Sequence, residues 1–147
     1  MVFILFFLIT APLAIFIHEL GHALGARIVQ AEKIHLYLGA GHKIGSFTCG
    51  KLTIHIGIFY FLGGFTLSER TPSYKKNERL IIILLGPVMN GAFSLVTYFL
   101  CKNLPFVNIR LFIYFNAWLF IMNLVPYKIG DKRSDGYMFL QTLLRDK

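Results

Sequence analysis

Three stretches of the chain are long enough and apolar enough to cross a bilayer as helices. They lie at about 2–29, at 80–101 and at about 107–126. A transmembrane helix needs about 20 predominantly apolar residues. The pattern therefore predicts three spanning helices, and Pro12 marks a position where the first can kink because proline removes one backbone hydrogen bond.

The region between the first two predicted helices, residues 33–67, has the alternation of β-strands. Apolar and polar side chains alternate at 34–38 and again at 52–56, and glycines mark turns between them. The apolar run 56–67 is too short to span, so we interpret it as re-entrant or interfacial. The predicted fold class is an all-α membrane protein, with a three-helix core and a small membrane-associated β-hairpin region between the first and second helices. We expect one domain over 1–147.

The composition and charge agree with a membrane protein. Hydrophobic residues make up 56% of the 147 positions and charged residues 15%, whereas a soluble domain has about 25% charged residues. This excludes a disordered chain and a coiled coil. The net charge of +8 does not indicate nucleic acid here, because the basic residues flank apolar runs. Most of them lie between the first two helices or after the third, which predicts that this side is cytoplasmic and the N-terminus outside.

The most specific motif is HELGH at residues 18–22, inside the first apolar segment. Positions i and i+4 share one face of a helix, so His18 and His22 can hold one metal ion. Glu19 beside them can act as a general base on water. The alternative is a helix with two buried or interfacial histidines. Inserting a charged residue at the centre of a membrane helix costs about 2.5–3.5 kcal/mol, which favours a functional role.

A third metal ligand is expected, because a catalytic zinc takes three protein ligands and keeps one position open. Asp135 is the candidate. It follows the third predicted helix, and three spans return the chain to the side where His18 and His22 lie. Asp131 is the alternative metal ligand, and either carboxylate can also be a solvated loop residue. The remaining histidines, expected on exposed strands or turns, are His35, His42 and His55.

Asparagines on the second and third predicted helices have two open interpretations. Gly86, Asn90 and Ser94 fall on one helix face at a spacing of four, where small residues allow close packing. Asn116 and Asn123 likewise share a face of the third helix. Such asparagines can form interhelical hydrogen bonds worth about 0.6 kcal/mol each. Alternatively, Asn90 or Asn123 binds the substrate backbone or stabilises an oxyanion.

Taken in order, three motifs resemble the site-2 protease family of intramembrane zinc metalloproteases, specifically its compact bacterial, sporulation-protease-like members. HELGH at 18–22 is similar to the family's first-helix motif, and GPVMN at 86–90 to its middle-helix motif. NLVP at 123–126, followed by Asp-Gly at 135–136, is similar to the third-helix motif, whose Asp supplies a zinc ligand. In the common family pattern the Asp-Gly follows the proline more closely, so Asp131 stays open as the ligand.

The resemblance implies a zinc metalloendopeptidase with one Zn²⁺ per chain, held by His18, His22 and Asp135. Glu19 would be its general base. Its substrate would be a single-span membrane protein, hydrolysed in or near the transmembrane segment, and we expect residues 52–62 to offer a strand edge that captures the unwound substrate. The alternative function is a non-catalytic zinc-binding membrane regulatory or scaffold protein.

The same resemblance implies a multi-pass protein of the bacterial plasma membrane. The distribution of lysine and arginine predicts a cytoplasmic C-terminus, and the three spans place the active site towards the same side. The expected partners are the substrate and the lipid bilayer, with no nucleic acid. A second copy of the chain or a regulatory membrane protein is a further candidate partner.

Overall fold

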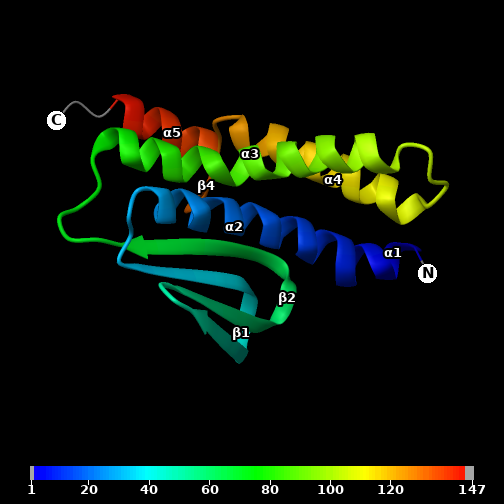
Figure 1. The fold of residues 1–147 in the computed structure, drawn as a ribbon, viewed down its shortest axis with the longest axis horizontal. Helices are drawn as coiled ribbons and strands as arrows, with labels where there is room; N and C mark the ends of the chain where they lie inside the picture. Colours follow the sequence, from blue (N-terminus) through cyan, green and yellow to red (C-terminus); the bar gives the residue numbers. More distant parts are fainter. Residues whose placement is uncertain (1, 145–147) are drawn as a thin grey trace.

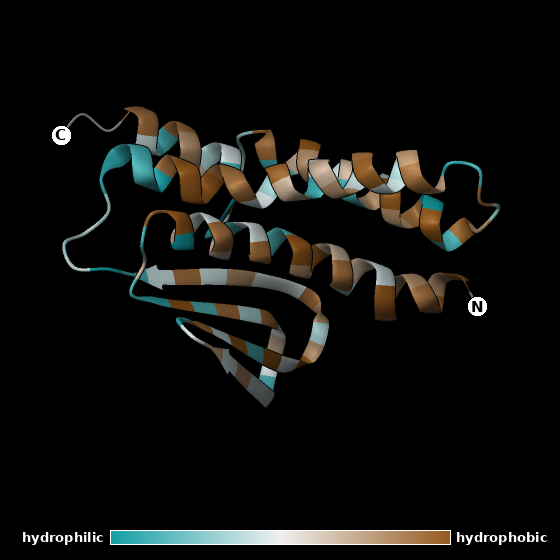
Figure 2. Cartoon of the chain, in the orientation of Figure 1, coloured by the Kyte–Doolittle hydropathy of each residue, from teal (hydrophilic) through white to brown (hydrophobic). Residues whose placement is uncertain are grey.

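The computed structural model describes residues 2–144, in which a layer of long helices lies against a bent β-sheet (Figure 1). Three continuous helical stretches are long and apolar enough to cross a membrane, as the sequence predicts. Figure 2 shows hydrophobic residues along most of them and hydrophilic residues in the loop that joins the sheet to the second stretch. These stretches are α1 (Val2–Leu5) with η1 (Phe6–Thr10) and α2 (Ala11–Ile28), then α3 (Lys76–Cys101), then α4 (Val107–Leu124).

The first stretch passes Pro12 without breaking, because a π-helical turn and a side chain from the sheet accommodate the proline. Pro12 has no N–H, so the carbonyl of Leu8, four residues earlier, has no helical donor there. The hydroxyl of Tyr60 donates to this Leu8 carbonyl at 3.3 Å. The π-helical turn η1 ends directly before α2, where Pro12 occupies the first turn. A π-helical turn therefore lies just before Pro12 within a continuous helical stretch.

The sheet is larger than predicted and consists of β1 (Lys33–Cys49) and β2 (Leu52–Glu69). The two strands pair antiparallel between 33–38 and 64–69 and between 45–49 and 52–56, whereas 34–38 and 52–56 lie side by side in the same direction. Both strands bend, so that four rows lie side by side in the order 45–49, 52–56, 34–38 and 64–69. Glycines with positive φ, which residues with a Cβ rarely adopt, occur at the bends, for example Gly63 at φ 103°.

This arrangement corrects three predictions. The chain is not all-α, since the strands extend from 33 to 69. The run 56–67 is not a separate re-entrant segment, because its backbone belongs to β2 and pairs with β1. Residues 52–56 lie between two other rows and have no free edge, so the expected strand edge at 52–62 is also wrong over that part. In the described residues, the row next to the helices, 64–68, has a strand partner on only one side.

One face of the sheet packs on α2. Ile34 and Leu36 are almost fully buried and contact Ala23 and Ala26 of α2. The small alanines let the strand approach the helix closely, so apolar area on both elements is removed from water or lipid. The opposite face carries a row of stacked rings, in which Tyr37 lies 4.5 Å from His55 and 4.5 Å from Phe65.

On its other side α2 packs against α3 through glycines. A Cβ on Gly21 would lie 2.3 Å from the Leu85 carbonyl oxygen, and one on Gly25 would lie 2.8 Å from the Cα of Ile82. At these two positions the absence of a side chain brings the two helices into close contact. The same contact brings the two histidines of the first helix against α3.

Candidate metal centre

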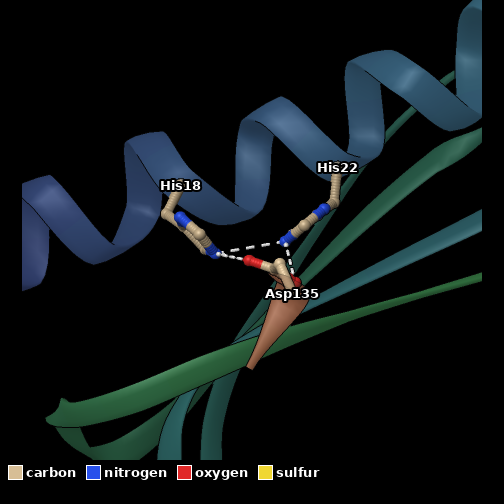
Figure 3. A group of neighbouring side chains, drawn as sticks. All are labelled: His18, His22 and Asp135. Atoms are coloured by element: carbon tan, nitrogen blue, oxygen red, sulfur yellow. Dashed lines mark hydrogen bonds and ion pairs between the residues drawn. The ribbon is translucent and has the colours of Figure 1, made fainter. Parts of the chain in front are cut away.

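His18, His22 and Asp135 converge on one point, as Figure 3 shows. Their potential ligand atoms all lie within 4.8 Å of one another. The two Nε2 atoms are 3.1 Å apart, and the Asp135 carboxylate lies 3.0 Å from His18 Nε2 and 3.4 Å from His22 Nε2. Asp131 is exposed in the turn between β3 (Lys128–Ile129) and β4 (Lys132–Arg133), outside this group.

The tautomer of His18 is fixed by a buried asparagine. The amide nitrogen of Asn90 donates to the Ala14 carbonyl at 2.9 Å and to Asn116 Oδ1 at 2.8 Å. Since a backbone carbonyl can only accept, this end of the Asn90 amide is the nitrogen, and its oxygen faces His18. His18 Nδ1 therefore donates to Asn90 Oδ1 at 2.7 Å. In the neutral imidazole, Nε2 then carries the lone pair and points to the common centre.

The same reasoning applies to His22. Its Nδ1 lies 2.8 Å from the Ile82 carbonyl oxygen, which can only accept, so Nδ1 carries the proton. Its Nε2 lone pair is left for the centre. Gly86 makes room for the ring, because a Cβ at that position would lie 2.3 Å from its Cε1 and Nε2 atoms.

Three electron-pair donors therefore face one another, which favours a bound cation. The Asp135 side chain is 5% exposed, and its Oδ2 is buried without a hydrogen-bond partner in the described residues. Two imidazole nitrogens and one carboxylate oxygen are a typical donor set for catalytic zinc. The residues present fit a zinc ion.

Asp135 reaches the histidines because a small hairpin closes the chain before it. Ser134 closes the hairpin that begins after Pro126. Its N–H donates to the Tyr127 carbonyl at 3.0 Å, and its hydroxyl donates to the Val125 carbonyl at 2.7 Å. Strands β3 and β4 lie between the two ends of this hairpin. The residues between Pro126 and Asp135 thus form a small hairpin. Because its two ends are hydrogen-bonded to each other, Asp135 lies close to the end of α4.

From this point α5 (Asp135–Leu144) begins, with Ser134 as its cap. The Tyr137 N–H donates to the Ser134 hydroxyl at 3.1 Å, which satisfies one of the free donors in the first turn. Gly136 is required by packing, because a Cβ there would lie 2.1 Å from the Leu124 carbonyl oxygen. Asp135 is therefore held by a capped helix start that is pressed against the end of α4.

Glu19 lies beside this group, in a cavity of about 430 Å³. Its side chain is 6% exposed, and the hydroxyl of Thr66 donates to Glu19 Oε2 at 2.8 Å. The cavity connects the three candidate ligands with the free edge of the sheet, and Asn123 and Met138 also line it.

The two candidate asparagines have different surroundings. Asn90 is fully buried, and both hydrogens of its amide are used by Ala14 and Asn116, so it has no donor left for a substrate. Asn123 lines the cavity and gives one amide hydrogen to the Leu119 carbonyl in its own helix. Its second amide hydrogen has no partner among the described residues.

Sequence reasoning missed Thr66 and Ser134. An isolated hydroxyl in a strand carries no signal of its own, and the cap position of Ser134 was visible only as a serine before Asp-Gly. His35 and His55 do meet, with His35 Nδ1 3.2 Å from His55 Nε2 across neighbouring rows of the sheet. They form a separate pair and do not belong to the group around Asp135.

The fold places three residues that could hold a metal ion next to helices that are apolar enough to span a membrane. Residues 5–110 match the model of Peptidase family M50, and the chain therefore belongs to this family, the site-2 protease family. The match includes HELGH and GPVMN but ends before Asp135, so the third ligand rests on the geometry described above. Among curated proteins no individual match was found. The family and the three apolar helices identify the chain as an integral membrane protein of a metallopeptidase family that is typically zinc-dependent.

Proposed function

We propose that this protein is an intramembrane zinc endopeptidase that hydrolyses a peptide bond in or near the transmembrane segment of another membrane protein. The observation that carries the proposal is the convergence of two imidazole lone pairs and one carboxylate beside Glu19, in a cavity that a free strand edge borders. A purely structural metal site has no need for an adjacent base or for access by a peptide.

The metal would be held by His18, His22 and Asp135. When bound, Zn²⁺ supplies Lewis-acid chemistry, which acidifies water and polarises the scissile carbonyl. Glu19 accepts a proton from the attacking water and later gives a proton to the leaving amine. The site lies at a cavity, so water can reach it although the helices are apolar.

We assign the two asparagines to different tasks. Asn90 orients His18, because it accepts the Nδ1 proton and is shielded from the cavity. Asn123 stabilises the developing oxyanion with its second amide hydrogen, since it lines the same cavity as Glu19. Replacing Asn123 with alanine should lower kcat about 100-fold or more without loss of zinc.

The substrate would bind as an additional strand along residues 64–68. This row borders the cavity, and its outer edge has no strand partner in the described residues. Main-chain hydrogen bonds to such an edge hold a peptide in extended form, which exposes its carbonyls for attack. Cysteines introduced at Phe65 or Leu67 should crosslink to every second substrate position near the cleavage site. Crosslinks at helical spacing would contradict strand binding.

For the topology, we propose an external N-terminus, a cytoplasmic C-terminus and a site towards the cytoplasm. The support is the excess of lysine and arginine around the sheet and in the tail. Cys49 is exposed and lies at the same end of the molecule as Arg27, where α2 ends. With Cys101 replaced by serine, an impermeant maleimide should label Cys49 in inverted vesicles and not in intact cells.

The central experiment reconstitutes the protein with a single-span substrate and measures both cleavage and zinc per chain. Glu19→Gln should keep zinc and lose cleavage, and Asp135→Asn should lose zinc. Asp131→Asn is the matched control and should behave as wild type, since Asp131 is exposed in a turn. Equal cleavage by wild type and Glu19→Gln would refute the protease mechanism. Zinc binding without cleavage of any tested substrate would favour the regulatory alternative.

A further inference from the structure

The general base is in contact with the sheet as well as with its own helix. Thr66 Oγ1 lies 2.8 Å from Glu19 Oε2 and 3.1 Å from the Glu19 carbonyl oxygen. A hydroxyl has one hydrogen to donate. The carboxylate oxygen of Glu19 is the nearer and the stronger acceptor, so the Thr66 hydroxyl donates to it. Among the described residues, no other hydrogen bond to the Glu19 side chain is present. One hydroxyl from a distant part of the chain therefore holds this carboxylate.

The strand also limits where the Glu19 side chain can go. Gly64 lies two residues before Thr66, on the same face of the row. A Cβ at Gly64 would lie 2.9 Å from Glu19 Cγ, so the strand backbone packs directly on the methylene groups of the base. Gly64 and Thr66 together form a cradle for a side chain that is 6% exposed.

We propose that Thr66 is a positioning residue for the catalytic step, and that its hydroxyl fixes the Glu19 carboxylate next to the metal group. The inference rests on the proposed function and adds to it. Thr66 belongs to the row 64–68 whose outer edge we assign to the substrate. The same segment therefore holds the base and receives the peptide, so the distance between the base and the scissile bond is set within one strand.

The test compares Thr66→Val, which keeps the branched shape and removes the hydroxyl, with Thr66→Ser, which keeps the hydroxyl. A correctly placed general base contributes about 10²–10⁴-fold to the rate. We expect Thr66→Val to lower kcat at least tenfold, with KM within twofold of wild type and one zinc per chain. Thr66→Ser should restore most of the rate. Thr53→Val is the matched control, because among residues 2–144 the Thr53 hydroxyl bonds to Thr48 on the same sheet and to no other group.

A second readout does not depend on activity. In zinc-loaded protein with ¹³C-labelled glutamate carboxyls, the Glu19→Gln variant identifies the Glu19 signal. This signal should shift in Thr66→Val and stay near its wild-type position in Thr66→Ser. If the wild type cleaves nothing, the proposed function fails, but this spectrum still decides whether Thr66 holds Glu19.

Three results would overturn the inference. The first is an unchanged kcat in Thr66→Val, and the second is a Glu19 signal that is the same in all three proteins. The third is a change in binding. Loss of zinc in Thr66→Val would place Thr66 in metal binding, and a rise in KM with kcat unchanged would place it in substrate binding.

Discussion

Replacing Asn90 with leucine should weaken zinc binding by about 10- to 100-fold, the usual effect of removing a group that orients a ligand. Asn90 Oδ1 is the only acceptor for His18 Nδ1–H in the described residues. Without it, the proton is free to move to Nε2, where it would face Asp135 Oδ2 at 3.0 Å and block the lone pair needed for the metal. The loss corresponds to about 1.4–2.8 kcal/mol in binding free energy, at 1.4 kcal/mol for each factor of ten.

Asn90→Asp is the matched control for this prediction. Both variants lose the amide hydrogens that bond to Ala14 and Asn116, so both should lower thermal stability. Only the aspartate keeps an acceptor for His18 Nδ1–H. The zinc affinity of Asn90→Asp should therefore stay within about threefold of wild type. Removing an orienting group would weaken zinc binding by at least about tenfold.

The assay is a zinc titration of the detergent-solubilised protein against a chromophoric chelator. It reports affinity directly and needs no substrate. If Asn90→Leu binds zinc as tightly as wild type and Asn90→Asp, the orientation of His18 does not depend on Asn90. The assignment of the His18 tautomer would then be wrong.

Three further substitutions test the packing at the site and the ion pair that joins the end of the sheet to the start of α3. Gly86→Ala should reduce zinc affinity at least tenfold, because the new methyl group would overlap the ring of His22. Gly45→Ala is the control and should leave zinc affinity unchanged, because the space around Gly45 is open. Ser134→Ala should lower stability by about 0.5–2 kcal/mol through loss of a helix cap, and its zinc content should fall as well; a variant with wild-type melting temperature and zinc would contradict the capping role. Arg70→Lys should lower the melting temperature, because lysine cannot reproduce the bidentate contact of Arg70 with Glu78 at 3.0 and 2.6 Å. An unchanged melting temperature would show that this contact does not contribute to stability.

The helices and the two histidines could be predicted because they depend on local periodicity. A long apolar run must form its backbone hydrogen bonds within itself in a membrane, which leaves the helix as the default. The spacing of His18 and His22 then places both on one face. Gly86 and Asn90 follow the same rule on the second helix, so their common face was predictable as well.

The third candidate ligand depended on tertiary structure. The Asp-Gly pair in the sequence favoured Asp135, whereas the spacing after Pro126 left Asp131 as the alternative. Hydrogen bonds between Ser134 and Tyr127 close that hairpin, so that Asp135 lies next to α4 while Asp131 is in an exposed turn. These hydrogen bonds span only seven residues, and it is the packing of this hairpin at the end of α4 that places Asp135 beside the two histidines.

For the sheet as well, the sequence predicted the strands, and the tertiary structure decided their order. Alternation identified strands near 34–38 and 52–56, but the row order places 52–56 inside the sheet and gives the free edge to 64–68. That order arises where both strands bend and pair with more than one neighbour. By itself, the sequence determined which segments are helical or extended and which residue types can carry the chemistry. Only the tertiary structure decided that Thr66 meets Glu19 and that Asn90 meets His18, because these contacts depend on how the sheet and α3 pack against α2.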